Sequence, residues 1–281
     1  MRRLRLGQVD YLNCLPVYHA LEEGLVSLDA ELVKGTPAQL NHLFLEGKLD
    51  LTPLSSIEYA RHSEQCLILP GISISADGRV ASILLFSKVP VPLLKGRRVC
   101  LPTSSATSIA LLQILLQHYY RIEVEYLLVP PNLESMLGQA EAALLIGDDA
   151  LLAHQEVLKN GASLYVTDLG EVWKDLTGQK MVYALWVLRR EFAEAFPEEV
   201  AHIASALLEA KRLGYADLSA LVEKGRRLRG LPVDVLEDYF ATIRHDFGPE
   251  YRQALLTYYD YARRSGLLQK RVRLQVWGEG Q

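Results

Sequence analysis

The chain has 281 residues, of which 49% are hydrophobic and 23% are charged, and its formal net charge at pH 7 is −4. This length and composition are typical of a soluble globular protein with one large domain or two modest ones, and a slightly acidic chain has no general attraction for nucleic acid or an anionic membrane. The longest apolar segments are also far shorter than the roughly 20 residues that span a bilayer, so a membrane-spanning protein is not expected.

Short apolar strands alternate with helices over the first 86 residues. We expect strands at 4–12, 31–34, 49–53, 66–73 and 80–86, and helices at 17–23, 39–46 and 57–60. Thr36 and Pro37 supply an N-cap and a first-turn proline for the second helix. Ser55 and Glu58 have the spacing of a capping box for the third. This alternation indicates an α/β fold with a largely parallel sheet.

A second set of strands and helices follows Pro90, Pro92 and Gly96, which indicate a crossing between domains. We expect strands at 98–101, 124–129, 142–146, 164–166 and 181–188, and helices at 109–120, 133–139 and 151–158. The strand at 181–188 is long enough to run back into the first domain. The chain therefore predicts two doubly wound lobes, a discontinuous lobe 1 (1–87 with 188–281) and an inserted lobe 2 (88–187).

The pattern becomes helical after Pro197. We expect amphipathic helices at 198–212, 217–229, 233–244 and 249–264, and a final strand at 272–277. The tyrosines at 258, 259 and 261 have helical spacing, which favours packing over a stacking surface. The basic run at 226–229 is interpreted as a solvated helix end, where positive charge suits the helix dipole.

Small polar residues stand at four predicted helix starts, each directly after a strand. They are Asn13, the pair Ser55 and Ser56, the loop residues Ser105, Thr107 and Ser108, and the pair Gly147 and Asp148. A polar group at the carboxyl end of a strand faces the crevice where α/β sheets bind ligands. A helix start also offers free N–H groups to an anion. Each of these residues alone could be an ordinary cap, but together they predict a site for a carboxylate or phosphate between the lobes.

Other chemistries find little support in the sequence. It contains no glycine-rich phosphate loop, no HExxH pair and no GxSxG motif. The seven histidines are scattered, so we expect no metal site and no Ser-His pair. Cys14, Cys66 and Cys100 are odd in number and lack zinc or disulfide spacing. Polar residues interrupt every apolar stretch that a secretory signal would need near the N-terminus. We therefore expect a protein of the reducing cytoplasm.

Four segments resemble the chorismate dehydratase family, whose enzymes open the futalosine route to menaquinone. The segments are 10–16 (Asp-Tyr-Leu-Asn-Cys-Leu-Pro), 49–61 (Leu-Asp-Leu-Thr-Pro-Leu-Ser-Ser-Ile-Glu-Tyr-Ala-Arg), the turn at 105–108 (Ser-Ala-Thr-Ser), and 173–186 from Trp173 through Thr177 and Gly178 to Trp186. They occur in the family order and span most of residues 5–190. The first two are specific, and the helical C-terminal part matches in character only.

The resemblance implies a type II periplasmic-binding-protein-like fold with a helical C-terminal segment, used in the cytoplasm as an enzyme. It implies loss of water from chorismate, a dianion, to give 3-[(1-carboxyvinyl)oxy]benzoate, with no metal and no organic cofactor. Such an enzyme must hold two carboxylates and stabilise charge delocalised into the ring carboxylate. Donors at helix starts suit both tasks, and Asn13 would place one near the reacting carbons.

No strong base is evident in the matched segments. We therefore hypothesise that the substrate's own enolpyruvyl carboxylate removes the ring proton while Asn13 fixes its orientation, with Asp148 as the alternative base. Two other functions remain open. One is dihydroxynaphthoate synthase of the same pathway, against which segment 10–16 argues, and the other is a non-catalytic cytoplasmic protein that binds a small anion.

Overall fold

The computed structural model describes residues 3–279, and within that range the strands form two five-stranded sheets. Residues 1–2 and 280–281, which belong to the expected lobe 1, lie outside the described residues. The first sheet has the order β2-β1-β3-β10-β4 and the second the order β7-β6-β8-β5-β9. The first comprises β1 (Leu4–Val9), β2 (Ala30–Gly35), β3 (Leu51–Ser55), β4 (Cys66–Ala76) and β10 (Met181–Arg189). The second comprises β5 (Ile83–Ser87), β6 (Arg98–Pro102), β7 (Glu125–Val129), β8 (Ala142–Ile146) and β9 (Tyr165–Asp168).

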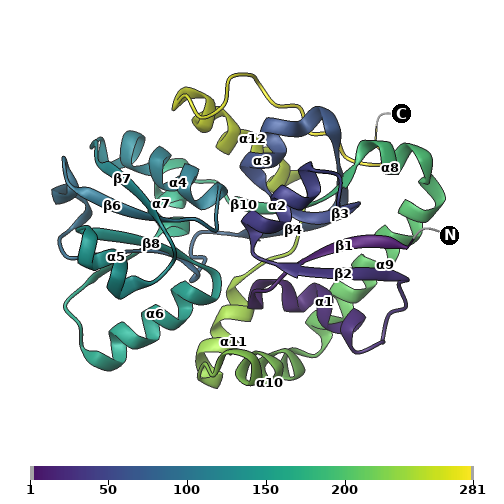
Figure 1. Cartoon of the computed structure of the whole chain (residues 1–281), viewed down its shortest axis with the longest axis horizontal. Coiled ribbons are helices and arrows are strands. Elements are labelled where there is room, and N and C mark those ends of the chain that lie inside the picture. The colour runs from purple at the N-terminus through teal and green to yellow at the C-terminus, as the bar shows by residue number, and fades with distance from the viewer. Residues whose placement is uncertain (1–2, 280–281) are drawn as a thin grey trace.

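Each sheet is mixed, and its antiparallel strand is the one that enters from the other lobe. β1 runs parallel to β2 and β3, whereas β10 runs antiparallel to both β3 and β4. In the second sheet β6 runs parallel to β7 and β8, and β5 runs antiparallel to β8 and β9. Figure 1 shows the two sheets side by side, with the chain passing between them where β4 and β10 approach the second lobe.

Sheet pairing shifts both lobe boundaries from the positions expected at 87/88 and 187/188. β5 pairs with β8 and β9, so it belongs to the inserted lobe although it precedes residue 88. β10 pairs with β3 and β4 from Met181 onward, so it belongs to the first lobe. Both strands are almost wholly buried. A strand that is apolar on both faces has the same sequence pattern in either sheet, so the pattern could not show which sheet it joins.

Helices cover both sheets and give the expected doubly wound arrangement. The first lobe has α1 (Leu15–Glu22), α2 (Pro37–Leu45) and α3 (Ser56–His62), and the second has α4 (Thr107–Leu115), α5 (Leu133–Gln139), α6 (Gly147–Asn160) and α7 (Leu169–Thr177). The N-cap expected at Thr36 is confirmed, and Gln39 completes a capping box with it, since the two side chains cap each other's backbone. The one expected at Ser55 is wrong, because the Ser55 side chain makes no cap bond.

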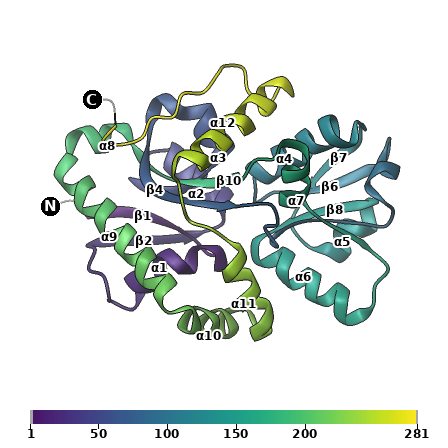
Figure 2. The same cartoon turned by 180° about the vertical axis from the view of Figure 1, so that it is seen from behind.

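The C-terminal segment is helical, as expected, and packs on the first lobe. It contains α8 (Arg190–Ala195), α9 (Pro197–Ala216), α10 (Leu218–Arg229), α11 (Val233–Thr242) and α12 (Pro249–Arg264). α9 lies so close to α1 that a Cβ on Gly214 would fall 2.0 Å from the Pro16 carbonyl oxygen. Figure 2 shows α9 crossing in front of α1, and α12 beside α3 and α4. Of the tyrosines on α12, Tyr258 and Tyr259 are buried, so packing explains them.

The expected strand at 272–277 does not form. Only Val276 makes an isolated bridge, to Ile68 at the edge of β4. β4 pairs with β10 along one edge. Besides the bridge to Val276, β4 makes a second isolated bridge, between Ser75 and Arg244. Two short contacts with β4 therefore replace a sixth strand.

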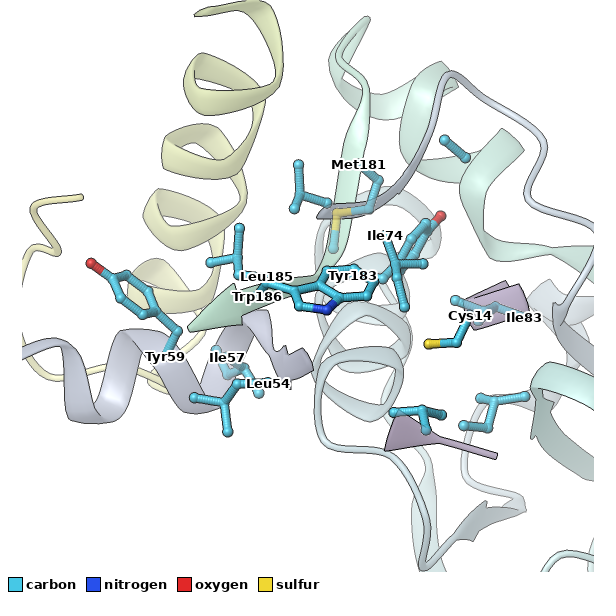
Figure 3. Packing of buried hydrophobic residues seen from close by; sticks show 14 of the residues in the cluster. Cys14, Leu54, Ile57, Tyr59, Ile74, Ile83, Met181, Tyr183, Leu185 and Trp186 are labelled. Atoms are coloured by element: carbon cyan, nitrogen blue, oxygen red, sulfur yellow. The ribbon is translucent and has the colours of Figure 1, made fainter. Parts of the chain in front are cut away.

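β10 forms the middle of the core between the lobes. Figure 3 shows Tyr183, Leu185 and Trp186 of β10 among Leu54, Ile57 and Ile74. Trp186 is fully buried, and its indole N–H donates to the Tyr18 hydroxyl over 3.1 Å. In the part of the chain that the structure describes, no helix combines the length and apolar character needed to cross a bilayer.

Candidate functional site

A cavity lies between the two sheets, where the ends of β1, β3 and β8 meet the starts of α4 and α6. Both lobes contribute to its wall, and we call it the inner cavity. It is lined by Val9, Tyr11, Asn13, Pro37, Pro53, Ser55, Ile74, Val80, Ser82, Ile83, Ser105, Thr107, Ser108, Ile146, Gly147, Tyr183, Ala184 and Ile243. None of these residues carries a charged side chain.

The inner cavity brings together six of the eight site residues expected from the sequence, namely Asn13, Ser55, Ser105, Thr107, Ser108 and Gly147. The other two lie outside it. The Ser56 hydroxyl is fully buried and donates to the Val182 carbonyl over 2.8 Å, so it serves the core. Asp148 lines a neighbouring cleft instead. Consecutive residues at a helix start point in different directions, and the sequence pattern could not separate them.

Asn13 lies in a short 3₁₀ turn, Leu12–Cys14, that follows β1 and precedes α1. Its side-chain Oδ1 is buried, yet among the described residues this atom has no hydrogen-bond partner. A buried amide oxygen without a partner costs free energy. Asn13 Oδ1 is therefore available to accept from a donor group of a ligand in the inner cavity, and the side chain is not acting as a cap.

Three hydroxyls around the inner cavity are held in a donating orientation. Ser55 N–H donates to Asn41 Oδ1 over 3.3 Å, which leaves Asn41 Nδ2 to donate to Ser55 Oγ over 3.0 Å. Thr107 Oγ1 accepts from the Ile57 N–H over 3.2 Å, and Ser105 Oγ accepts from the Ser108 N–H over 3.3 Å. Because each oxygen already accepts a bond from the protein, its own O–H remains to be donated.

Asn41 was not among the residues expected from the sequence. It is a buried asparagine inside α2, with 6% of its surface exposed. An asparagine in a helix interior is unfavourable for the helix, and that is the signal that could have found it.

Tyr11 separates the inner cavity from a second, larger opening. Its ring lies against Gly147, where an added Cβ would fall 2.7 Å from the Tyr11 Cδ2 atom. Gly147 also has a φ of +57°, a conformation that favours glycine. Burial, with a smaller effect from Asp149, raises the pKa of Tyr11 to about 12, so its hydroxyl stays neutral.

The second opening, which we call the outer cleft, is lined by Asp10, Tyr11, Lys34, Gly35, Thr36, Ala38, Gln39, Thr103, Ser104, Pro131, Asp148, Asp149, Leu152 and Arg229. Asp148 there joins the two lobes. Its Oδ1 accepts from the Leu12 N–H over 2.9 Å, and its Oδ2 accepts from Arg229 Nε over 2.5 Å. Burial raises the pKa of Asp148 to about 6, against the opposing effects of Arg229 and the Leu12 N–H.

The interpretation of segment 226–229 as a solvated helix end is wrong for Arg229. This side chain also donates to the Asp10 carbonyl over 2.7 Å, so it reaches across the outer cleft. Its sequence neighbours gave no sign of this, because Arg226 pairs with Glu223 on the same helix. A partner 81 residues away is visible only in the folded chain.

The hydroxyl groups of Ser55, Ser105 and Thr107 are the neutral donors that the inner cavity offers to an anion. Both Asp148 oxygens are occupied by groups outside this cavity, so Asp148 is poorly placed to remove a proton from a ligand inside it. Among residues 3–279, no cluster of three His, Cys, Asp or Glu side chains could hold a metal ion.

Comparison with known proteins gives consistent matches along the chain. A protein-family model described as menaquinone biosynthesis matches residues 4–264. A chorismate dehydratase of Thermus thermophilus is 34% identical over 263 residues, which are 87% of this chain and 90% of that protein. A 1,4-dihydroxy-6-naphtoate synthase of the same organism is 31% identical over 196 residues, 69% of each protein.

Solved structures show the same fold at low sequence identity. The alkanesulfonate-binding protein SsuA of Xanthomonas axonopodis pv. citri, bound to MOPS, superposes with a TM-score of 0.71 at 19% identity, covering 98% of this chain and 97% of that one. A Candida albicans protein described as having the generic periplasmic binding protein fold gives a TM-score of 0.68 at 11% identity, covering 99% of each chain. The expected periplasmic-binding-protein-like fold is therefore confirmed.

Proposed function

The chain belongs to the menaquinone biosynthesis family, and we propose that it is a chorismate dehydratase, a carbon–oxygen hydro-lyase that converts chorismate to 3-[(1-carboxyvinyl)oxy]benzoate and water. The observation that carries this proposal is the inner cavity itself. It combines the unpartnered Asn13 Oδ1, which can accept from a substrate hydroxyl, with hydroxyls from both lobes that can donate. The similarity to the Thermus chorismate dehydratase over 87% of the chain supports the same assignment.

The reaction removes one proton and one hydroxide from adjacent ring carbons of chorismate. The C–H bond beside the ether oxygen breaks, its electron pair forms the new ring double bond, and the neighbouring C–O bond breaks to release hydroxide. The proton and the hydroxide together leave as one water molecule. Aromatisation of the ring supplies the driving force, so the protein needs to lower the barrier without supplying an oxidant or reductant.

Neutral donors suit a dianionic substrate in this cavity. The O–H groups of Ser55, Ser105 and Thr107 would hold the two carboxylates and take up the charge that spreads into the ring carboxylate. One preorganised donor at a developing charge can contribute about 3 kcal/mol. The ring proton would pass to the enolpyruvyl carboxylate of the substrate, oriented by the Asn13 amide, and from there to the leaving hydroxide.

Two alternatives are distinguished by their products. The dihydroxynaphthoate synthase match spans only 69% of the chain, and such an enzyme would leave chorismate unchanged. A non-catalytic anion-binding protein is the second alternative, because the alkanesulfonate-binding protein has the same fold. It would bind a carboxylate in the same cavity without converting it.

The test is to incubate the purified protein with chorismate alone and to follow the aromatic absorbance, with mass spectrometry of the product. We expect a product 18 mass units lighter than chorismate, as loss of water requires. Asn13→Ala should lower kcat by about 10²- to 10³-fold, whereas Asn160→Ala, at an exposed asparagine on α6, should leave it unchanged. Binding of chorismate without product would contradict the proposal, as would a near-normal rate for Asn13→Ala.

A further inference from the structure

A buried histidine lies directly behind Asn13. His245 follows α11 in the sequence, and 1% of its surface is exposed. Its backbone is fixed on β4, because the His245 carbonyl accepts from the Ser73 N–H over 3.3 Å and the neighbouring Arg244 bridges to Ser75. The His245 ring lies edge-on to Trp186, with 6.2 Å between ring centroids. The ring is therefore held in one place by the core of the first lobe.

Both ring nitrogens of His245 have partners, and these fix its protonation state. Nε2 lies 2.7 Å from the Asn13 carbonyl oxygen. A carbonyl can only accept, so Nε2 carries the proton. Nδ1 lies 2.7 Å from the Tyr215 hydroxyl. In the neutral ring Nδ1 has a lone pair, so Tyr215 donates to it in preference to the Ile243 carbonyl, which lies farther from the hydroxyl at 3.2 Å. The result is a series of two hydrogen bonds, in which the Tyr215 hydroxyl donates to His245 Nδ1 and His245 Nε2 donates to the Asn13 carbonyl.

The groups around His245 favour the neutral ring. Burial lowers the pKa of His245 to about 4, and Lys211 and Arg244 act in the same direction. The bond to the Asn13 carbonyl and the carboxylate of Asp246 oppose this shift without reversing it. Lys211 Nζ also donates to the His245 carbonyl over 3.2 Å, which holds this cation at the backbone side of the histidine.

We propose that His245, oriented by Tyr215, is a positioning residue for Asn13 in the dehydration. This inference rests on the proposed function. Asn13 stands in a turn that has no side-chain cap, and its side chain lines the inner cavity while its carbonyl is held from the opposite side by His245. The His245 bond thus fixes the peptide from which the Asn13 side chain projects. His245 acts through Asn13 and does not itself line the inner cavity.

A double-mutant cycle tests whether His245 acts through Asn13. We expect His245→Ala to lower kcat about tenfold with a smaller change in KM, because a displaced reacting group loses alignment. In the Asn13→Ala background the same change should have no further effect on kcat. His245→Gln, whose side-chain amide can still donate to the Asn13 carbonyl, should recover most of the lost kcat. His202→Gln, at an exposed histidine on α9, is the matched control.

Tyr215→Phe provides a second, milder variant if His245→Ala does not fold. It removes only the hydroxyl that orients the ring, and we expect a fall in kcat of a few-fold. Nitrogen NMR of the wild-type protein should show His245 protonated at Nε2 and unprotonated at Nδ1 at neutral pH. If the fold-losses in kcat of Asn13→Ala and His245→Ala multiply in the double variant, the two residues act independently and the inference is overturned. A proton on Nδ1 would also overturn it. Failure of the wild-type protein to convert chorismate would instead overturn the proposed function, which the NMR result does not depend on.

Discussion

The inner cavity and the outer cleft share Tyr11 but differ in almost every other property. Among the described residues, the lining of the inner cavity has no charged side chain, and its polar groups are amides and hydroxyls. The outer cleft is lined by both acids and bases, and its Asp148 and Arg229 form an ion pair across the lobes. Burial favours the neutral form of the titratable group next to each region. It lowers the pKa of His245 behind the cavity to about 4 and raises that of Asp148 in the cleft to about 6.

This difference indicates that the two regions have different roles, ligand binding in the inner cavity and contact between the lobes in the outer cleft. Neutral donors can hold a dianion without a charged side chain in the cavity wall. A charged side chain there would be buried and unpaired in the empty site, which costs free energy. The charged pair then joins the lobes at a distance from the reacting atoms. The inner cavity is thus the place of the proposed chemistry, whereas the outer cleft holds the two lobes together through Asp148 and Arg229. The following variants test that separation.

Acidification should destabilise the wild-type protein more than a His245→Gln variant. The pKa of His245 is about 4 in the folded chain against an ordinary value of 6.5. The unfolded chain therefore binds the proton first as the pH falls. The stability that the neutral ring contributes is complete above pH 6.5 and is lost between pH 6.5 and 4, by about 3 kcal/mol.

Asp148 works in the opposite direction, because its raised pKa lets the folded chain bind a proton first between about pH 6 and 4. It is present in both proteins, so the difference between them isolates His245. Urea unfolding of both proteins at pH 7 and pH 4.5 measures this difference. Parallel losses of stability in the two proteins would contradict the assignment of a neutral His245.

Gly147→Ala should be more harmful than Gly161→Ala, although the glycines stand at the two ends of α6, Gly147 as its first residue and Gly161 as its C-cap, and both have positive φ. Gly147 has a φ of +57° and Gly161 a φ of +61°. An added Cβ at Gly147 meets the Tyr11 ring, whereas at Gly161 it meets nothing within 4 Å. Backbone strain costs about 1 kcal/mol at either position, and overpacking against Tyr11 adds about 2 kcal/mol at Gly147.

Thermal unfolding and the KM for chorismate would measure the two glycine variants. We expect KM to rise only for Gly147→Ala, since only this variant pushes Tyr11 away from the second lobe. Equal effects on stability and KM would show that Tyr11 does not close the boundary between the two regions.

Asp148→Asn should raise KM about tenfold and change kcat much less, because it weakens the ion pair with Arg229 that connects the two lobes. Arg229→Gln should have a similar effect, and the two changes combined should cost little more than either alone. Arg226→Gln, on the same helix but paired with Glu223, is the control. A large loss of kcat for Asp148→Asn, with KM unchanged, would mean that Asp148 is the base and that the two regions are not separate.

Ser55→Ala and Ser56→Ala should differ in their effect on KM although the residues are adjacent. Ser55 lines the inner cavity, so its loss should raise KM a few-fold, and it should also lower stability by about 1 kcal/mol because the buried Asn41 Nδ2 loses its acceptor. Ser56 donates to the Val182 carbonyl inside the core, so its loss should lower stability by about 1 kcal/mol and leave KM nearly unchanged. Steady-state kinetics and urea unfolding of the two variants provide the measurements.

The contacts of individual residues show how far the sequence could predict this site. The small residues at the predicted helix starts include Asn13, Ser55 and Gly147, and the structure places all three on the walls of the inner cavity. The same pattern also predicted Ser56 and Asp148 for the site, but neither lines the inner cavity. The pattern gives the position of a residue along the chain and not the direction of its side chain. The pattern did not predict the roles of Arg229 and His245, because neither residue follows a strand and their partners are far away in the sequence.

The order of strands and helices, the α/β class and the helical C-terminal segment were determined by the sequence alone, because periodicity and caps act over a few residues. Only the tertiary structure decided which sheet β5 and β10 join, which polar residues face the inner cavity, and which charges meet across the lobes. Those outcomes depend on long-range packing. A buried strand satisfies its hydrogen bonds in either sheet, and a polar side chain gains a partner only where the folded chain brings one to it.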